Sequence, residues 1–201
     1  MKITYANDSL PALKLIEKDP SLKPIFARTK LVEFELESDY FLALVSAIVS
    51  QQLSGKVAQA IYKKVDAFFL GQITPEKILA ADIEDMRKLG LSYRKAEYIK
   101  SIAEHVMDGT VRFDSLDSMS DEEIIEMLIQ IKGIGRWSAE MFLMFALGRP
   151  NVFSSGDFGL RKALSLLYGE EISVDKANEL CLKWDPYKTV VAYYLWRFLE
   201  N

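Results

Sequence analysis

The sequence predicts an all-α fold, and three observations support this. Helix-capping residues and terminating glycines recur along the 201 residues, runs of alternating apolar and polar residues are almost absent, and half of the residues are hydrophobic. That hydrophobic content is enough to bury a substantial core without disulfide bonds. Segments 2–5 and 31–36 have some extended character, but neither predicts a convincing sheet.

Each predicted helix is placed by a capping residue before it and by a glycine, or the end of its apolar pattern, after it. The Thr74-Pro75 pair and the capping box of Ser120 and Glu123 mark two starts most clearly. In chain order, the predicted helices run from about Ser38 to Val49, Ser54 to Gly71, a short one from Thr74, Asp82 to Gly90, Ser92 to Gly109, Ser120 to Gln130, Gly135 to Gly148, Asp157 to Gly169, and a last one from Asp185.

Composition excludes several kinds of chemistry. A single cysteine, Cys181, rules out an iron–sulfur cluster or a zinc site built on four cysteines, and a single histidine, His105, argues against a multi-histidine metal centre. Both residues are most simply structural.

No segment reaches the roughly 18 consecutive apolar residues of a membrane span, so we expect a cytoplasmic protein. The net charge of −4 requires that any nucleic-acid contact use a local basic face.

The most informative segment is the turn at residues 131–136, where Lys132-Gly133-Ile134-Gly135 connects two predicted helices. Glycines let a phosphate approach the main chain closely, and the amides at the start of the second helix favour an anion. Lys132 and Arg136 add positive charge on either side. Such a turn can grip a nucleic-acid backbone without reading its sequence. The alternative is a tight turn that only buries Ile134 in the core.

This hairpin and the loop that follows it, VFSSGDFGLRK at residues 152–162, resemble the helix–hairpin–helix–Gly/Pro–Asp DNA glycosylases. Four further motifs resemble the 3-methyladenine glycosylase II branch of that superfamily: SQQLS at 50–54, GLSYRKA at 90–96, WDPY at 184–187 and YLW at 194–196. The resemblance implies a two-lobed helical fold with the active site in the cleft between the lobes. One lobe would span about 36–148 and contain the hairpin, and the other would combine 1–35 with 149–201.

The resemblance assigns catalysis to Asp157, at the mouth of that cleft. Cleavage of an N-glycosidic bond builds positive charge on the sugar, which a fixed carboxylate stabilises while water completes the displacement. The alternative for Asp157 is a helix N-cap with an ion pair to Arg161, and the two roles are compatible because a helix N-terminus favours an ionised carboxylate. Bifunctional relatives carry a nucleophilic lysine two residues after the second hairpin glycine. This chain has Trp137 there, so we expect hydrolysis without strand cleavage.

The resemblance also implies a base pocket and a DNA-binding surface. The expected pocket residues are Trp137, Met141, Phe158 and Trp196, whose rings would attract a cationic alkylated base, although each could instead be core packing. Gln52, supported by Leu53, would fill the gap left by the extruded base, although Gln51 and Gln52 could merely cap a helix. The remaining expected DNA contacts are Lys132, Gly133, Gly135, Arg136, Ser138, Arg161 and Lys162. Lys56, Arg94 and Lys95 would complete the basic face, although each alone could be a solvated surface charge.

The resemblance implies no required cofactor, but a monovalent cation, Na⁺ or K⁺, could sit on the main-chain carbonyls of Ile129, Ile131 and Ile134. The expected partner is double-stranded DNA with a damaged base, bound by a monomer that hands the abasic site to downstream repair enzymes. Nucleoid association, or a nuclear location in a eukaryote, would follow from that function. Two alternatives stay open: a glycosylase for a deaminated or oxidised base, and a non-catalytic structure-specific DNA-binding protein.

Overall fold

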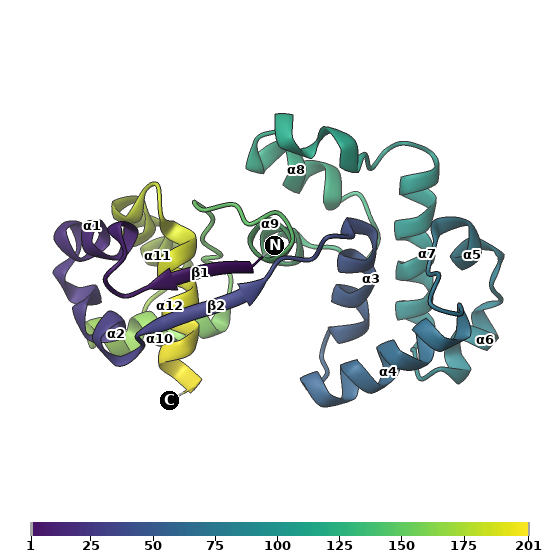
Figure 1. The fold of residues 1–201 in the computed structure, drawn as a ribbon, viewed down its shortest axis with the longest axis horizontal. Coiled ribbons are helices and arrows are strands. Elements are labelled where there is room, and N and C mark those ends of the chain that lie inside the picture. Colours follow the sequence, from purple (N-terminus) through teal and green to yellow (C-terminus); the bar gives the residue numbers. More distant parts are fainter. Residues whose placement is uncertain (1, 201) are drawn as a thin grey trace. The chain divides into compact units, whose positions relative to one another are not determined.

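The computed structural model describes residues 2–200, and it is predominantly helical, as the sequence predicts (Figure 1). The chain divides into two compact units. The terminal unit comprises Met1–Leu36 and Leu143–Asn201, and the middle unit comprises Glu37–Phe142. The second boundary therefore falls inside a helix, whereas the sequence analysis set it at Gly148. Among the described residues, none of the helices combines the length and the apolar character that crossing a membrane requires.

The terminal unit is built around its last helix, α12 (Lys188–Glu200), which packs against α10, α2, α1 and strand β2 (Figure 1). Fully buried Tyr194 on α12 meets the Phe26 ring of α2 in the core of this unit, and Leu195 beside it is fully buried too. The other elements of the unit are β1 (Lys2–Ala6), α1 (Leu10–Lys18), η1 (Pro20–Leu22), α2 (Lys23–Arg28), β2 (Leu31–Glu35), α10 (Phe158–Tyr168), α11 (Val174–Cys181) and η3 (Leu182–Trp184).

The middle unit is arranged around α7 (Tyr93–Met107), which packs against α3, α5 and α6 (Figure 1). Ile99 and Ile102 of α7 are fully buried, as is Ile48 of α3. The other elements are α3 (Tyr40–Ser50), α4 (Gly55–Phe68), α5 (Pro75–Ala80), α6 (Ile83–Lys88), η2 (Phe113–Ser118) and α8 (Asp121–Leu128). Helix α9 (Arg136–Phe145) begins in this unit and ends in the terminal one.

The two extended segments form a sheet that the sequence analysis did not predict. β1 and β2 pair antiparallel, with Ile3 opposite Phe34 and Tyr5 opposite Val32. The Tyr194 hydroxyl donates a hydrogen bond to the Tyr5 carbonyl at 2.8 Å. Because α1, η1 and α2 separate β1 from β2 in the chain, and β1 also contacts the far end of the chain, no local pattern could indicate the pairing.

The helix starts agree with their predicted capping residues, with two corrections. Thr74, Asp82, Ser92, Ser120 and Asp157 each accept a backbone N–H as N-caps, and Ser120 with Glu123 forms the predicted capping box. α3 is capped by Asp39 rather than by its neighbour Ser38, because the Asp39 carboxylate accepts the Leu42 N–H. The last helix begins at Lys188, later than predicted. Helices α1, α2 and α11 were not predicted.

Candidate active site

Asp157 is held at the N-terminus of α10 by two N–H donors on one oxygen. Its Oδ1 accepts the Leu160 backbone N–H at 2.7 Å and the Trp196 indole N–H at 3.1 Å. The carboxylate is half-buried, and it faces the positive end of the helix dipole. Asp157 is therefore an N-cap, as the sequence allows. A helix N-cap needs only the Leu160 N–H, so the additional hydrogen bond from Trp196 of α12 orients the carboxylate further.

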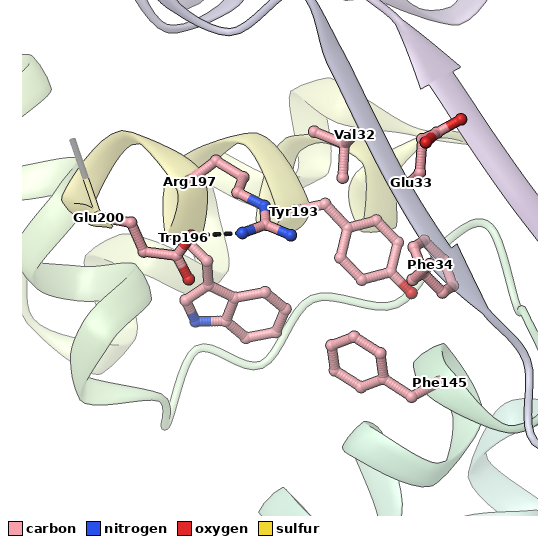
Figure 2. Close-up of a pocket in the computed structure, with 8 residues that line it drawn as sticks. All are labelled: Val32, Glu33, Phe34, Phe145, Tyr193, Trp196, Arg197 and Glu200. Atoms are coloured by element: carbon pink, nitrogen blue, oxygen red, sulfur yellow. Dashed lines mark hydrogen bonds and ion pairs between the residues drawn. The ribbon is translucent and has the colours of Figure 1, made fainter. Parts of the chain in front are cut away.

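Trp196 also borders a cavity of about 220 Å³ that lies within the terminal unit (Figure 2). Aromatic rings from β2, α9 and α12 converge on this cavity: Phe34 and Tyr193 lie 4.3 Å apart between centroids, and Phe145 stacks on Trp196 at 5.7 Å. The lining also contains two carboxylates, each in an ion pair: Glu200 pairs with Arg197, and Glu33 pairs with Lys2 at 3.0 Å. The complete lining is Val32, Glu33, Phe34, Phe145, Tyr193, Trp196, Arg197 and Glu200.

Sequence reasoning missed three of these rings. Phe145 follows Met141 by four residues, the same helical spacing that links Met141 to Trp137, and Tyr193 precedes Trp196 by three, so spacing along each helix was an available signal. Phe34 had no such signal, because its place depends on the β1–β2 pairing. Tyr193 is buried, and its hydroxyl donates to the Met144 carbonyl at 2.8 Å. Burial raises the pKa of Tyr193, so this hydroxyl stays protonated.

The other predicted residues of the terminal unit lie on α10. Phe158, a predicted pocket residue, is its first residue and is 73% exposed. The Arg161 guanidinium donates to the Ser155 carbonyl at 2.9 Å, so it braces the loop that carries Asp157. Lys162 is exposed, as a phosphate contact requires.

In the middle unit, the predicted wedge lies in the turn between α3 and α4. Gln52 is exposed and has a φ of 57°, a left-handed conformation that is unfavourable for residues other than glycine, asparagine and aspartate. Leu53 beside it is 37% exposed. Gln51 points the other way, and its side-chain amide donates to the Gly133 carbonyl at 2.9 Å. The turn therefore separates an inward glutamine from an outward one held in a strained backbone conformation.

The hairpin places its two glycines in different surroundings. Gly133 has a φ of 87°, and a Cβ there would lie 2.2 Å from a ring carbon of Tyr98. A Cβ on Gly135 would meet nothing within 4 Å, so Gly135 leaves open space in front of the main chain. Ile134 is buried between them, which gives the hairpin both the structural role and the open main chain that the sequence suggests.

Helix α9 follows the hairpin and carries four predicted site residues. Trp137 is 48% exposed, and Met141, one turn later, is half-buried, as is Ser138. Arg136 donates to both oxygens of Glu122 at 2.7 and 2.8 Å and to Glu140 at 3.2 Å. The pair with Glu122 raises the pKa of Arg136 further above its already high value. Its charge is thus shared with two carboxylates rather than presented alone.

The site carries the chemistry of a carboxylate beside aromatic rings, not that of a metal ligand cluster. Among residues 2–200, no group of three or more His, Cys, Asp or Glu side chains could hold a metal ion. Asp157 and Trp196 come together within the terminal unit, whereas Trp137, Met141 and the hairpin belong to the middle unit. The predicted cleft between the lobes stays a prediction.

A helical fold, a Gly-x-Gly hairpin and an aspartate that caps the next helix define a known class of proteins. The chain belongs to the HhH-GPD superfamily of base excision DNA repair proteins, whose family model matches residues 45–186.

Curated and solved relatives narrow the comparison. The chain is 40% identical over 162 residues to DNA-3-methyladenine glycosylase 1 of Schizosaccharomyces pombe, which covers 77% of this chain and 70% of that protein. It is similar to the crystal structure of a DNA-3-methyladenine glycosidase from Bacillus halodurans, with a TM-score of 0.89, 38% identity, and coverage of 99% of this chain and 95% of that one. The S. pombe 3-methyladenine DNA glycosylase Mag1, solved in complex with abasic DNA, gives a TM-score of 0.84 at 32% identity, with coverage of 96% and 98%.

Proposed function

We propose that this chain is a monofunctional DNA glycosylase that hydrolyses the N-glycosidic bond of alkylated purines, of the 3-methyladenine and 7-methylguanine type, in base-excision repair. Its family membership and the names of its relatives support the reaction class. The observation that carries the proposal is the Asp157 carboxylate, fixed by Leu160 and by Trp196, with Trp196 also lining an aromatic cavity.

Asp157 would act on the sugar. As the bond to the base lengthens, positive charge develops on the deoxyribose, and a carboxylate that is already oriented stabilises it without reorganisation. The two N–H donors on Oδ1 prevent the side chain from rotating away. The same carboxylate would orient the water that attacks the sugar carbon as the base departs, and the product is an intact abasic site.

The cavity would select the leaving base. Its volume of about 220 Å³ is below the range typical of drug-sized ligands, which suits a single base rather than a whole nucleotide. Faces of Phe34, Phe145 and Trp196 attract a positively charged ring through cation–π contact. The two carboxylates of the lining are already paired, Glu33 with Lys2 and Glu200 with Arg197, so the attraction for a positive charge rests on the rings. Alkylation at a purine ring nitrogen supplies that charge and makes the base a better leaving group.

The absence of lyase chemistry rests on Trp137, because an indole cannot form a Schiff base with the sugar. Incubating the protein with abasic DNA and borohydride tests this. We expect no covalent adduct and no strand nick, and a trapped adduct would contradict the monofunctional assignment.

Asp157→Asn tests the proposal as a whole. The asparagine keeps the shape and one acceptor for Leu160 but loses the charge, so base release from methylated DNA should fall by about 10²-fold or more. Affinity for abasic DNA should stay close to that of the wild-type protein. Chromatographic identification of the released base separates alkylated purines from deaminated or oxidised bases. If the wild-type protein releases no base and the variant binds equally well, the chain is a binding module.

A monovalent cation at the hairpin is the finer part of the proposal. The Ile131 carbonyl accepts the Ile134 N–H at 3.1 Å, which leaves it a second lone pair for a cation, and the carbonyls of Ile129 and Ile134 would complete the set. Replacing K⁺ and Na⁺ by tetramethylammonium at constant ionic strength should then weaken DNA binding. Equal binding in both salts would remove the cation from the proposal.

A further inference from the structure

The Lys95 ammonium points into the protein rather than towards a ligand. Its Nζ donates to the carbonyls of Val49 at 2.7 Å and Gln51 at 2.8 Å, both at the C-terminal end of α3. The last carbonyls of a helix lack intrahelical partners and carry its negative dipole end, which a cation satisfies. Burial lowers the pKa of Lys95, in keeping with an ammonium withdrawn from water.

The same helix also holds the hairpin. Three residues after Lys95, the Tyr98 ring fills the space that a side chain on Gly133 would need. Three residues further on, the buried Ser101 hydroxyl accepts the backbone N–H of Lys132 at 3.2 Å. Residues at this spacing share one side of a helix, so a single stripe of α7 contacts both the α3–α4 turn and the hairpin.

Gln51 closes this arrangement into a ring of contacts. Lys95 binds the Gln51 carbonyl, and the Gln51 side chain binds the Gly133 carbonyl at 2.9 Å. Gly133 in turn rests on Tyr98 of α7. Beside this ring, Gln52 is exposed in its left-handed conformation, and such strain persists only where the surroundings hold it.

We propose that Lys95 is a positioning residue for base extrusion: by binding the Val49 and Gln51 carbonyls, it locks the α3–α4 turn to the hairpin, so that Gln52 is presented to the DNA duplex already in place. The inference rests on the proposed function, because it takes Gln52 as the residue that fills the vacated stack. It also replaces the sequence-based expectation that Lys95 contacts phosphate.

The test compares Lys95→Met with Lys100→Met. Methionine keeps an unbranched, largely apolar side chain as far as Cε and removes the ammonium. Lys100 is a matched control on the same helix, since its Nζ donates to the Leu79 carbonyl of α5 at 3.0 Å, away from the turn. Single-turnover release of 7-methylguanine is measured from a duplex with cytosine opposite the lesion and from one with an abasic site opposite it, where the lesion is already unpaired.

We expect Lys95→Met to slow release from the paired duplex by about tenfold or more, the rate equivalent of losing a charge-assisted hydrogen bond. Release from the unpaired duplex should slow by less than about threefold, because extrusion is easier there. Lys100→Met should change neither. The slope of log Kd against log salt should also stay unchanged, whereas a lost phosphate contact would reduce it by about 0.9.

Equal losses on both duplexes, a reduced salt slope, or no loss would each overturn the inference while leaving the glycosylase assignment intact. Inactive wild-type protein would instead count against the proposed function. Hydrogen–deuterium exchange decides the inference in that case too. Lys95→Met should speed exchange in both the α3–α4 turn and the hairpin, and unchanged exchange in either would overturn the proposed lock.

Discussion

The indole N–H of Trp196 and the carboxylate of Asp157 form a hydrogen bond of 3.1 Å that joins α12 to the start of α10. A second tryptophan in the same unit makes the same kind of bond: Trp184 donates to Oδ2 of Asp19 at 3.0 Å. Both Trp184 and Asp19 are buried, whereas Asp157 and Trp196 are half-buried beside a cavity. One pair is placed to stabilise the fold, and the other is placed to meet a ligand.

These two pairs give a matched prediction. Trp196→Phe removes the donor but keeps an aromatic ring, so base release should slow by about tenfold while thermal stability changes little. Trp184→Phe should instead lower the free energy of unfolding by about 1.5–3 kcal/mol, with the remaining folded protein active. Thermal melts and single-turnover kinetics on both variants check this. A Trp196→Phe protein that loses stability but keeps its rate would reverse the assignment.

The two hairpin glycines give a second prediction. Gly133→Ala should destabilise the protein by about 1–3 kcal/mol, because its Cβ would overlap the Tyr98 ring at a positive φ. Gly135→Ala has room for its methyl group, so its stability should stay within about 1 kcal/mol of the wild type. The methyl group would stand where a phosphate approaches, and DNA affinity should fall roughly fivefold. Urea denaturation and binding to abasic DNA separate the two effects, and equal DNA affinity for wild type and Gly135→Ala would exclude a phosphate contact at that glycine.

Local signals in the sequence were enough to place most helices, because capping residues and glycines act within one turn of where they stand. They also placed Asp157 at a helix N-terminus, as the structure confirms. The sheet and the place of Phe34 could not be predicted in this way, because α1, η1 and α2 separate β1 from β2 in the chain and β1 also accepts a hydrogen bond from Tyr194.

The basic residues show a second limit of prediction from the sequence. Arg136 and Lys95 look like free cations in the sequence, and only the folded chain reveals that Glu122 and two backbone carbonyls engage them. A residue type predicts the charge of a side chain but not its partner. Fewer cations are therefore available for a DNA-binding basic face than the sequence suggests, because Lys95 and Arg136 already have partners within the protein.

A third prediction concerns pH and Asp19. Burial alone would raise the pKa of this carboxyl, but hydrogen bonds from Tyr168 at 2.5 Å, Trp184 and the Ser21 amide lower it overall. Because the folded pKa lies below the unfolded value of about 3.9, the ionised carboxylate stabilises the fold above that pH. This contribution is lost as the pH falls through the folded pKa.

Asp19→Asn isolates that contribution. At neutral pH the variant should be less stable than the wild type by about 1–3 kcal/mol, because the Tyr168 and Trp184 donors lose a charged acceptor. Between about pH 5 and pH 3 the difference should narrow, since the wild-type protein alone loses the stabilisation. Urea denaturation across this range measures it. A difference that stays constant with pH would show that the folded pKa is not lowered.

The last prediction distinguishes cations that are available to bind DNA from cations that are already paired with groups of the protein. Lys132 is exposed and has no side-chain partner within residues 2–200, whereas Arg136 is bound by Glu122 through two hydrogen bonds. A cation that neutralises one phosphate contributes about 0.9 to the slope of log Kd against log salt. Lys132→Gln should therefore reduce the slope by about that amount, while Arg136→Gln should reduce it by clearly less than 0.9. Binding of abasic duplex DNA to both variants at several salt concentrations gives the slopes directly. Equal reductions would mean that Arg136 leaves Glu122 when DNA binds, and Glu122→Gln should then strengthen binding.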